Sequence, residues 1–267
     1  ELGISVSGGR SVATRQYHAG ALKIIRPHYL DETGQVYYIT ANPGGGYVGG
    51  DSYRIAVDVA DGASILFTDQ SATKVYRTPE SFVSQKIDFH VGAGAVLEYV
   101  PDQLILYRDA DFRQHMTVDL DPEASAFLSD IVTPGWSPDG GQFRYRQAHL
   151  RSEVRVGGKL ALVDNMRIMP ERDAETLHSP TFLGQNTHFA TALCFDPGID
   201  EDLIENVRAA LAEIEQIEAS VTACDVPGFV VRAVGSRTEH LMEAVQTAAN
   251  IVRSTLRGQG KLHMRQY

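Results

Sequence analysis

One pattern recurs through this chain: an alternating apolar run, a tight turn, and a second apolar run. Residues 55–67 read IAVDVADGASILF, and residues 87–99, which lie 32 positions further on, read IDFHVGAGAVLEY. Apolar residues at every second position are typical of a half-buried β-strand. Repetition with this period predicts stacked β-layers that bury a shared face, as in solenoids and β-helices.

Two further copies extend the pattern. Residues 116–128 read MTVDLDPEASAFL, 29 positions beyond the second copy, and residues 153–163 read EVRVGGKLALV in a shorter version. We therefore predict a mainly β protein, built as a β-helix-like stack of strand–turn–strand repeats. The repetitive β part is expected to span residues 1–195.

The pattern changes after residue 195. Residues 200–218 place apolar side chains on one helical face, with acidic residues in the first turn that suit the helix dipole. A short strand is predicted over residues 229–234, and the sequence from Ser236 to Glu239 has the form of a capping box that opens a second helix. We expect two helices near the C-terminus, in a helix–strand–helix part over residues 196–267. No linker separates the parts, so residues 1–267 are predicted to form a single domain.

Composition excludes several classes of protein. Hydrophobic residues make up 43% of the chain, and 24 Lys and Arg stand against 34 Asp and Glu, a formal net charge of −10. This acidic balance argues against binding to nucleic acid or to an anionic membrane. Only Cys194 and Cys224 are present, so no disulfide framework is expected, and no apolar run is long enough to span a membrane. A cytoplasmic protein is expected.

A glycine-rich stretch, NPGGGYVGGD at residues 42–51, satisfies the pattern G-x-G-x-x-G. A dinucleotide-binding loop must open a helix, whose N-terminus holds the pyrophosphate. Here the loop is followed by alternating apolar residues from Tyr53 onwards, which predict a strand. The nucleotide-binding interpretation therefore fails.

No catalytic or metal-binding motif is present in the sequence. HExxH, CxxC and His-x-His patterns are absent, and the nine histidines are scattered, so no stable metal site is predicted. A polar cluster is instead predicted between the repeats, where stacking would bring residues 70–74 near residues 102–103. It is either a structural lysine–acid pair or a polar channel or docking surface, and its members are Gln70, Lys74, Tyr76, Glu98 and Asp102.

Several of these stretches resemble the UreD family of urease accessory proteins, called UreH in some organisms. The similar segments occupy residues 42–51, 68–79, 92–114, 129–136 and 228–235, and the ending HMRQY is similar to Gram-positive members. Trp136 departs from the family, since many members carry arginine there. No role of that arginine is carried over to this chain.

The resemblance implies a scaffold chaperone and not an enzyme. Such proteins work with UreF, recruit the GTPase UreG, bind the urease apoprotein and assist nickel insertion. The resemblance also implies a β-helical fold, no tightly bound cofactor, and transient nickel along a route through the protein. Such transit needs weak oxygen or nitrogen ligands, for which the candidates are Asp51, His90, Glu98 and Asp102.

Partner contacts are expected near the C-terminus. The apolar ending with Leu262, Met264 and Tyr267 is a candidate for docking into a groove of a partner, or for folding back on its own core. Two alternatives remain beside the chaperone hypothesis. One is a β-helical hydrolase that uses Glu98 and Asp102 as an acid pair, and the other is a purely structural solenoid.

Overall fold

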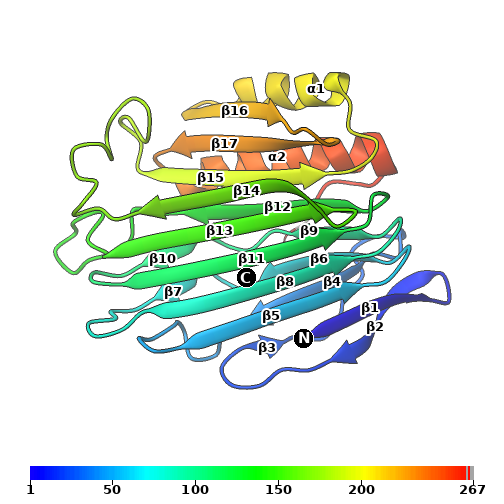
Figure 1. Ribbon diagram of the computed structural model, residues 1–267, viewed down its shortest axis with the longest axis horizontal. Coiled ribbons are helices and arrows are strands. Elements are labelled where there is room, and N and C mark those ends of the chain that lie inside the picture. The colour runs from blue at the N-terminus through cyan, green and yellow to red at the C-terminus, as the bar shows by residue number, and fades with distance from the viewer. Residues whose placement is uncertain (263, 265–267) are drawn as a thin grey trace.

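Two stacked β-sheets form the body of the protein (Figure 1). The computed structural model describes residues 1–262 and 264. Sheet A has seven strands, in the spatial order β14 (Lys159–Ile168), β13 (Gln147–Val156), β11 (Asp111–Leu120), β8 (Val83–Val91), β5 (Ser52–Val59), β1 (Leu2–Ser7) and β2 (Arg10–Gln16). Within the described residues, no helix is long and apolar enough to cross a membrane.

Sheet B has ten strands; in Figure 1 its strands β12, β9, β6 and β4 lie behind sheet A, and β15, β17 and β16 extend above it. Its main path runs β16 (Ile217–Ala223), β17 (Gly228–Gly235), β15 (His188–Phe195), β12 (Ser125–Val132), β9 (Val96–Tyr99), β6 (Ser64–Asp69), β4 (Val36–Ala41) and β3 (Lys23–Ile24). The short strands β7 (Thr73–Val75) and β10 (Leu104–Leu106) pair with each other beside this path.

Strand register confirms the predicted repeat. Strands β5, β8, β11 and β13 are parallel neighbours in sheet A, while β4, β6, β9 and β12 are parallel neighbours in sheet B. Ile55 lies opposite Ile87, which lies opposite Met116, so residues 32 and 29 positions apart are side by side. The chain therefore winds between the two sheets as a solenoid, and we call each full turn of it a coil. This arrangement confirms the mainly β prediction.

The fourth repeat differs from the other three. Strand β13 is parallel to β11, as the repeat requires, but after Gly157 and Gly158 the chain turns back into β14 within the same sheet. Both glycines have positive φ, 57° and 77°, which suits a tight hairpin. This unit is a hairpin at the edge of sheet A and not a further coil.

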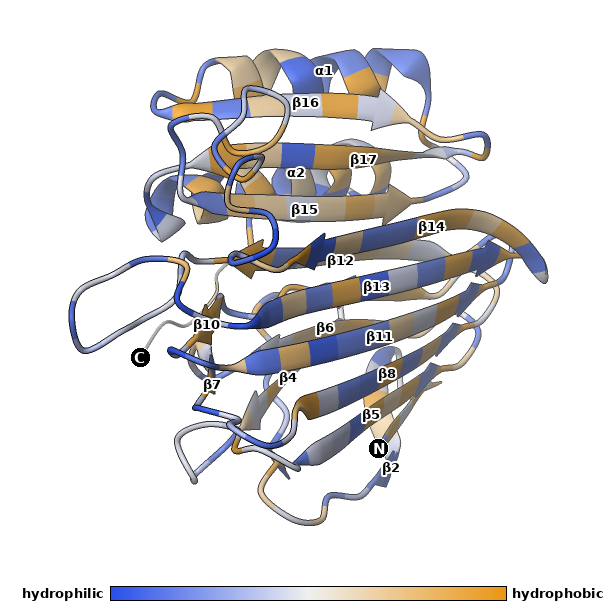
Figure 2. Cartoon of the chain, turned by 60° about the vertical axis from the view of Figure 1, so that its left-hand side comes forward, coloured by the Kyte–Doolittle hydropathy of each residue, from blue (hydrophilic) through white to orange (hydrophobic). Residues whose placement is uncertain are grey.

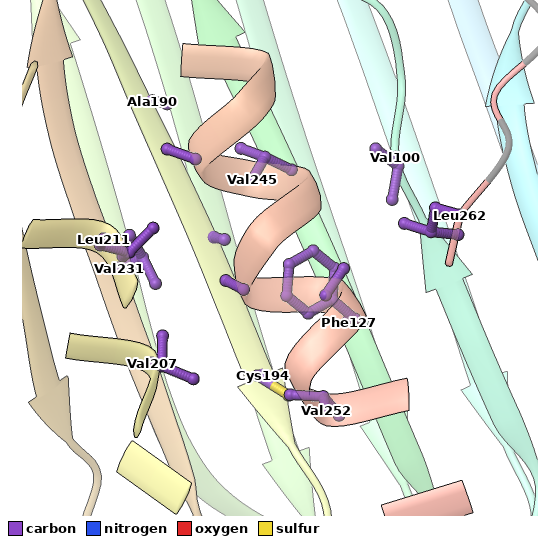
Figure 3. Packing of buried hydrophobic residues seen from close by; sticks show 14 of the residues in the cluster. Val100, Phe127, Ala190, Cys194, Val207, Leu211, Val231, Val245, Val252 and Leu262 are labelled. Atoms are coloured by element: carbon purple, nitrogen blue, oxygen red, sulfur yellow. The ribbon is translucent and has the colours of Figure 1, made fainter. Parts of the chain in front are cut away.

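Two apolar layers hold the fold together. Between the sheets, alternate side chains of each strand fill the interior, for example Phe89 and Leu128. A second layer covers the outer face of sheet B, where α1 (Glu201–Ala212) and α2 (Thr238–Arg257) pack (Figure 3). There Val207 of α1 and Val245 of α2 belong to the same buried cluster as Phe127 of β12.

The C-terminal part contains one strand more than predicted. The helix predicted over residues 200–218 ends at Ala212, and β16 begins at Ile217, where it pairs with β17. Hydrogen bonding to the sheet has overridden the local helical pattern here. The predicted capping box was also wrong, because Arg237 is the N-cap residue of α2 and makes no side-chain cap hydrogen bond.

The glycine-rich loop is a connection between β4 and β5, as expected. Its strand-like residue Tyr47 exchanges backbone hydrogen bonds with Lys74 and Tyr76 of the next coil, at 2.7 and 2.8 Å. A Cβ atom at Gly46 would lie 2.7 Å from the Tyr76 ring and 2.8 Å from the Lys74 carbonyl oxygen. Glycine is needed there because the loop packs directly on the neighbouring coil.

Candidate functional site: carboxylates inside the solenoid

A polar layer interrupts the apolar interior between the two sheets. Asp69, the last residue of β6, and Asp130 of β12 continue the inward-facing series that includes Phe67 and Leu128. The facing strands of sheet A contribute Gln85 and Gln114 at inward positions. Parallel stacking of the coils thus brings acids and amides from separate repeats into one layer.

These residues surround a cavity of about 20 Å³, whose lining also includes Asp102, three residues beyond β9. Gln114 donates from Nε2 to both carboxylate oxygens of Asp130, at 3.2 and 3.4 Å. The hydroxyl of Thr40 donates to Asp69. The partners of both carboxylates are therefore neutral groups.

No positive charge compensates this cluster. Among the described residues, no Lys, Arg or His nitrogen lies within 4.0 Å of Asp69, Asp102 or Asp130, whereas the structure has many ion pairs elsewhere. Burial raises the pKa of Asp69 to about 6, against the hydrogen bond from Thr40, and the charge of Asp102 raises it further. An unpaired buried carboxylate disfavours its ionised form in this way.

Asp130 is perturbed more strongly. Burial raises its pKa to about 7, the hydrogen bond from Gln114 opposes the rise, and the charges of Asp164 and Asp69 add to it. Burial also raises the pKa of Asp102. Near neutral pH, Asp69 and Asp130 therefore titrate, and a cation that approaches them competes with a proton.

Three neighbouring cavities, which share lining residues, lie between this layer and the N-terminal side of the solenoid. The cavity of about 20 Å³ shares Asp69 and Thr73 with a second cavity of about 30 Å³. The second shares Leu22 and Thr40 with a pocket of about 240 Å³ beside β5. A buried water needs roughly 10–15 Å³. The two inner cavities thus have room for one or two waters each.

This geometry suits a weak and transient cation site. Carboxylate, amide and hydroxyl oxygens are hard ligands, and none of them is a thiolate that would trap a transition metal. Within the described residues, no group of three His, Cys, Asp or Glu side chains is close enough to hold a metal ion. The inner cavities are too small for an ion with a full shell of waters, so a passing ion would exchange water for protein oxygens.

The structure brings together part of the predicted polar cluster. The backbone N–H of Thr73 donates to the carbonyl oxygen of Gln103 at 3.0 Å, so the two segments are neighbours as predicted. Lys74 is half-buried and lines the cavity of about 30 Å³ together with Asp69. The structural lysine–acid pair does not form, because no carboxylate of the described chain lies within ion-pair distance of Lys74.

Other predicted residues lie outside the layer. Gln70 is exposed, and Tyr76 packs on the glycine-rich loop and against Tyr107, with 4.9 Å between the ring centroids. Asp51 closes its own turn, because its Oδ2 accepts from the Val48 N–H at 2.9 Å and from the Tyr53 hydroxyl at 2.7 Å.

His90 lies on the outer face of sheet A, where its Nδ1 is 3.4 Å from Asp119 Oδ2. That face points away from the interior, since the strand neighbours of His90 at inward positions are Phe89 and Val91. His90 is therefore no part of the polar layer.

Glu98 also lies outside the polar layer, and its contacts serve the packing of α2 on sheet B. Its side chain is fully buried and points to the outer face of sheet B, opposite to Leu97 and Tyr99 in the interior. There it pairs with Arg253 and Arg257 of α2, the latter at 2.9 Å, in what we call the arginine clamp. Glu98 and Asp102 thus lie on different sides of sheet B. The acid pair on which the hydrolase alternative depends is not formed.

The C-terminal tail folds back on the protein. Leu262 is 6% exposed, belongs to the apolar cluster under α2, and donates its N–H to Asn250 Oδ1 at 2.7 Å. Figure 3 shows it beside Val100. Met264 packs on the same cluster, and Tyr267 lies outside the described residues. Of the two interpretations of the tail, folding back holds for Leu262 and Met264.

Sequence reasoning missed Asp69 and Asp130. A signal for them existed, because Phe67 and Leu128 occupy equivalent positions in the first and third repeats, and each aspartate follows two residues later. Extending the repeat alignment by two residues would have placed both acids at inward positions. The two glutamines carry a comparable signal, because Gln85 and Gln114 each lie two residues before the equivalent positions Ile87 and Met116.

Comparisons with known proteins agree on one family. A family model described as UreD urease accessory protein matches residues 1–266. The chain is 42% identical to the urease accessory protein UreD of Actinomyces naeslundii over 267 residues, covering 100% of this chain and 97% of the relative. It is 40% identical to that of Paenarthrobacter aurescens, covering 100% and 94%, and 34% identical to that of Bacillus cereus, covering 87% and 84%.

Proposed function

Since the chain belongs to the UreD family of urease accessory proteins, we propose that it serves urease maturation as a scaffold that assists nickel insertion. In this proposal it acts together with UreF, the GTPase UreG and the urease apoprotein, and it catalyses no reaction of its own. Nickel is its cargo and is held only in passing.

The observation that carries the nickel part of the proposal is the half-buried pair Asp69 and Asp130, which has no positive partner among the described residues. Burying an uncompensated carboxylate is unfavourable, so a protein has no structural reason to place two of them between its sheets. A divalent cation that enters would supply the missing charge. It would also displace the protons that bind to the two carboxyl groups at pH values near their raised pKa values of about 6 and about 7.

Nickel would move along this layer in steps. We propose that it enters by way of the larger pocket, passes Asp69, and reaches Asp102 and Asp130 through the two small cavities. Thr40, Gln85 and Gln114 would present neutral oxygens between the charged positions. Because no position in the described part of the chain offers three charged ligands at once, the ion would be released as readily as it is taken up.

The experiment is urease activation in cells that carry the urease genes, with this chain present, deleted, or replaced by a variant. Deletion is expected to leave abundant urease that is inactive and free of nickel. The double variant Asp69→Asn and Asp130→Asn keeps the shape and the hydrogen-bonding capacity of the layer. We expect it to co-purify with urease apoprotein while urease activity and nickel content fall by at least about tenfold.

The matched control is Asp58→Asn, which also removes one carboxylate but lies on the outer face of sheet A with 53% of its side chain exposed. It is expected to leave activation unchanged. Full urease activity in the absence of this chain would refute the maturation role. Normal activation by the double variant would refute only the route past Asp69 and Asp130.

A further inference from the structure

The outer face of sheet A carries an ordered pattern of charge. Because four of its strands are parallel and in register, side chains of successive coils form straight rows across the sheet. One row runs Arg54, Lys86, His115, Arg151, and the row beside it contains Arg113, His149 and Arg167. We call these two rows the cationic band. Figure 2 shows hydrophilic segments of β8, β11 and β13 side by side on this face.

The positive charges of the band exceed the negative charges beside it. Arg54 and Lys86 share the single carboxylate of Asp88, at 3.4 and 3.3 Å. Arg151, Arg155 and His115 all approach Glu153. Arg113 pairs with Asp111, with 3.0 Å between Nε and Oδ1. Arg167 donates to the neutral amide oxygen of Gln147 at 2.8 Å, and the charge of Asp173 lies nearby.

The side chains of the band are also accessible. Arg54 is 67% exposed, Lys86 54% and Arg113 45%. A band of positive charge on a chain with a net charge of −10 needs an explanation, because solubility would be served by the acidic surface alone.

We propose that the cationic band is the docking surface for an acidic α-helix of a partner protein. The band crosses five strands at about 4.8 Å each, so it is about 19 Å long. That length matches three to four turns of helix at 1.5 Å per residue. Carboxylates at positions i and i+3 or i+4 of a helix are about 5–6 Å apart, which is close to the distance of about 4.8 Å between neighbouring side chains within a row.

The neighbouring row favours a protein partner over nucleic acid. Two residues further along the strands, Asp88 and Glu153 form an acidic row parallel to the band. A phosphate backbone would be repelled there, because its charge has only one sign. A helix with acids on one side and bases on the other pairs with both rows, and it does so in only one orientation. This inference goes beyond the proposed function, because it requires neither nickel nor urease.

The test measures binding of a fluorescein-labelled helical peptide of 21 residues, with Glu at i and i+4 on one face and Ala elsewhere, to the full chain in about 50 mM salt. A peptide with Gln in place of Glu and a single-stranded DNA of 12 nucleotides serve as comparison probes. The band variant combines Arg54→Gln, Lys86→Gln and Arg151→Gln. Its control combines Arg26→Gln, Arg172→Gln and Arg237→Gln, which removes the same charge from exposed positions elsewhere.

We expect the Glu peptide to bind at least tenfold more tightly than the Gln peptide. The band variant is expected to weaken this binding at least tenfold, and the control variant less than twofold. Equal weakening by both variants would overturn the proposal, because it would show an effect of net charge alone. Absence of binding, or tighter binding of the DNA that the band variant abolishes, would also overturn it.

Urea unfolding of both variants is measured as well, to test whether they remain folded. If the triple variant unfolds, Arg54→Gln alone replaces it, since that side chain is largely exposed. A twofold to fourfold loss of peptide affinity is then expected, and an unchanged affinity would contradict the proposal.

Discussion

Carboxylates lie on both faces of sheet B, where Glu98 is fully buried and Asp69 and Asp130 are half-buried, and the protein provides different partners for them. Glu98 on the outer face is enclosed by the arginine clamp, with Gln35 Nε2 donating a further hydrogen bond at 2.9 Å. Asp69 and Asp130 on the inner face accept hydrogen bonds from one hydroxyl and one amide among the residues that the structure describes. Their pKa values are raised by burial, to about 6 and about 7.

The difference separates a structural charge from one that is available for a ligand. In the clamp, each charge is satisfied within the chain, and the bonds tie α2 to the strands beneath it. In the inner layer, the missing positive charge leaves the carboxylates poised between a proton and a cation. Substitutions at the two places should therefore differ in the sign of their effect on stability.

The largest effect is expected in the clamp. Arg253→Met leaves Glu98 buried with one partner fewer, and it also removes the hydrogen bond from Arg253 Nε to the Gly260 carbonyl oxygen, 2.9 Å long. We expect a loss of about 3–5 kcal/mol in the free energy of unfolding, measured by urea denaturation. Arg77→Met, which breaks an exposed pair with Asp109, is the control and should change it by less than about 0.5 kcal/mol. A loss below about 1 kcal/mol for Arg253→Met would show that the clamp is not a structural element.

The opposite sign is expected for the inner layer. The folded-state pKa of Asp69 is above its ordinary value, so the folded protein favours the neutral carboxyl, and this group's contribution to stability falls as the pH rises from about 4 to about 6. Asp69→Asn removes the ionised form. It should stabilise the protein at pH 8 by on the order of 2 kcal/mol, and the gain should vanish at pH 4.

Urea denaturation of the wild type and Asp69→Asn at both pH values measures this gain. Asp130→Asn should behave in the same way, and the pH range over which its stability gain develops should extend upward to about pH 7. Destabilisation of either variant at pH 8 would mean that the ionised carboxylate has a stabilising partner, and the comparison between the two faces would fail.

A smaller effect of the same sign is expected for Asp102→Asn. Burial raises the pKa of Asp102, but its side chain is less completely enclosed than those of Asp69 and Asp130. Solvent screening therefore reduces the expected gain at pH 8 to below about 1 kcal/mol. The same denaturation series measures it, and a gain larger than that of Asp69→Asn would contradict the ranking by burial.

The smallest effect is expected for His90→Ala. The His90 ring is 60% exposed beside Asp119 on the outer face of sheet A, and it takes no part in the polar layer. Stability should change by less than about 0.5 kcal/mol, and urease activation in cells should be unaffected. Impaired activation by this variant would place a step of nickel transfer on the outer face.

The parts of the fold that could be predicted are those with a local or periodic cause. Ile55 and Ile87 were matched from their alternating surroundings, and the structure places them side by side. The end of α1 was not predictable, because residues 213–218 continue the helical pattern and leave it only when Ile217 pairs with β17. Ser236 was expected to cap α2 on local grounds, but the N-cap position belongs to Arg237.

The candidate site was predicted only in outline. That residues 70–74 lie beside residues 102–103 followed from the stacking of repeats, since register carries over from coil to coil, and Thr73 is hydrogen-bonded to Gln103. The separation of Glu98 from Asp102 did not follow, because the partner of Glu98 lies 155 residues away in α2.

By itself, the sequence determined the solenoid, the turn chemistry at its glycines and the family, because these depend on periodicity and on residues near each other in the chain. Only the tertiary structure decided which carboxylates serve the fold and which face the inner cavities. A charge is structural or available according to whether a counter-charge reaches it, and that counter-charge comes from a distant part of the chain. For Glu98 it is supplied by α2, and for Asp69 and Asp130 the described chain supplies none.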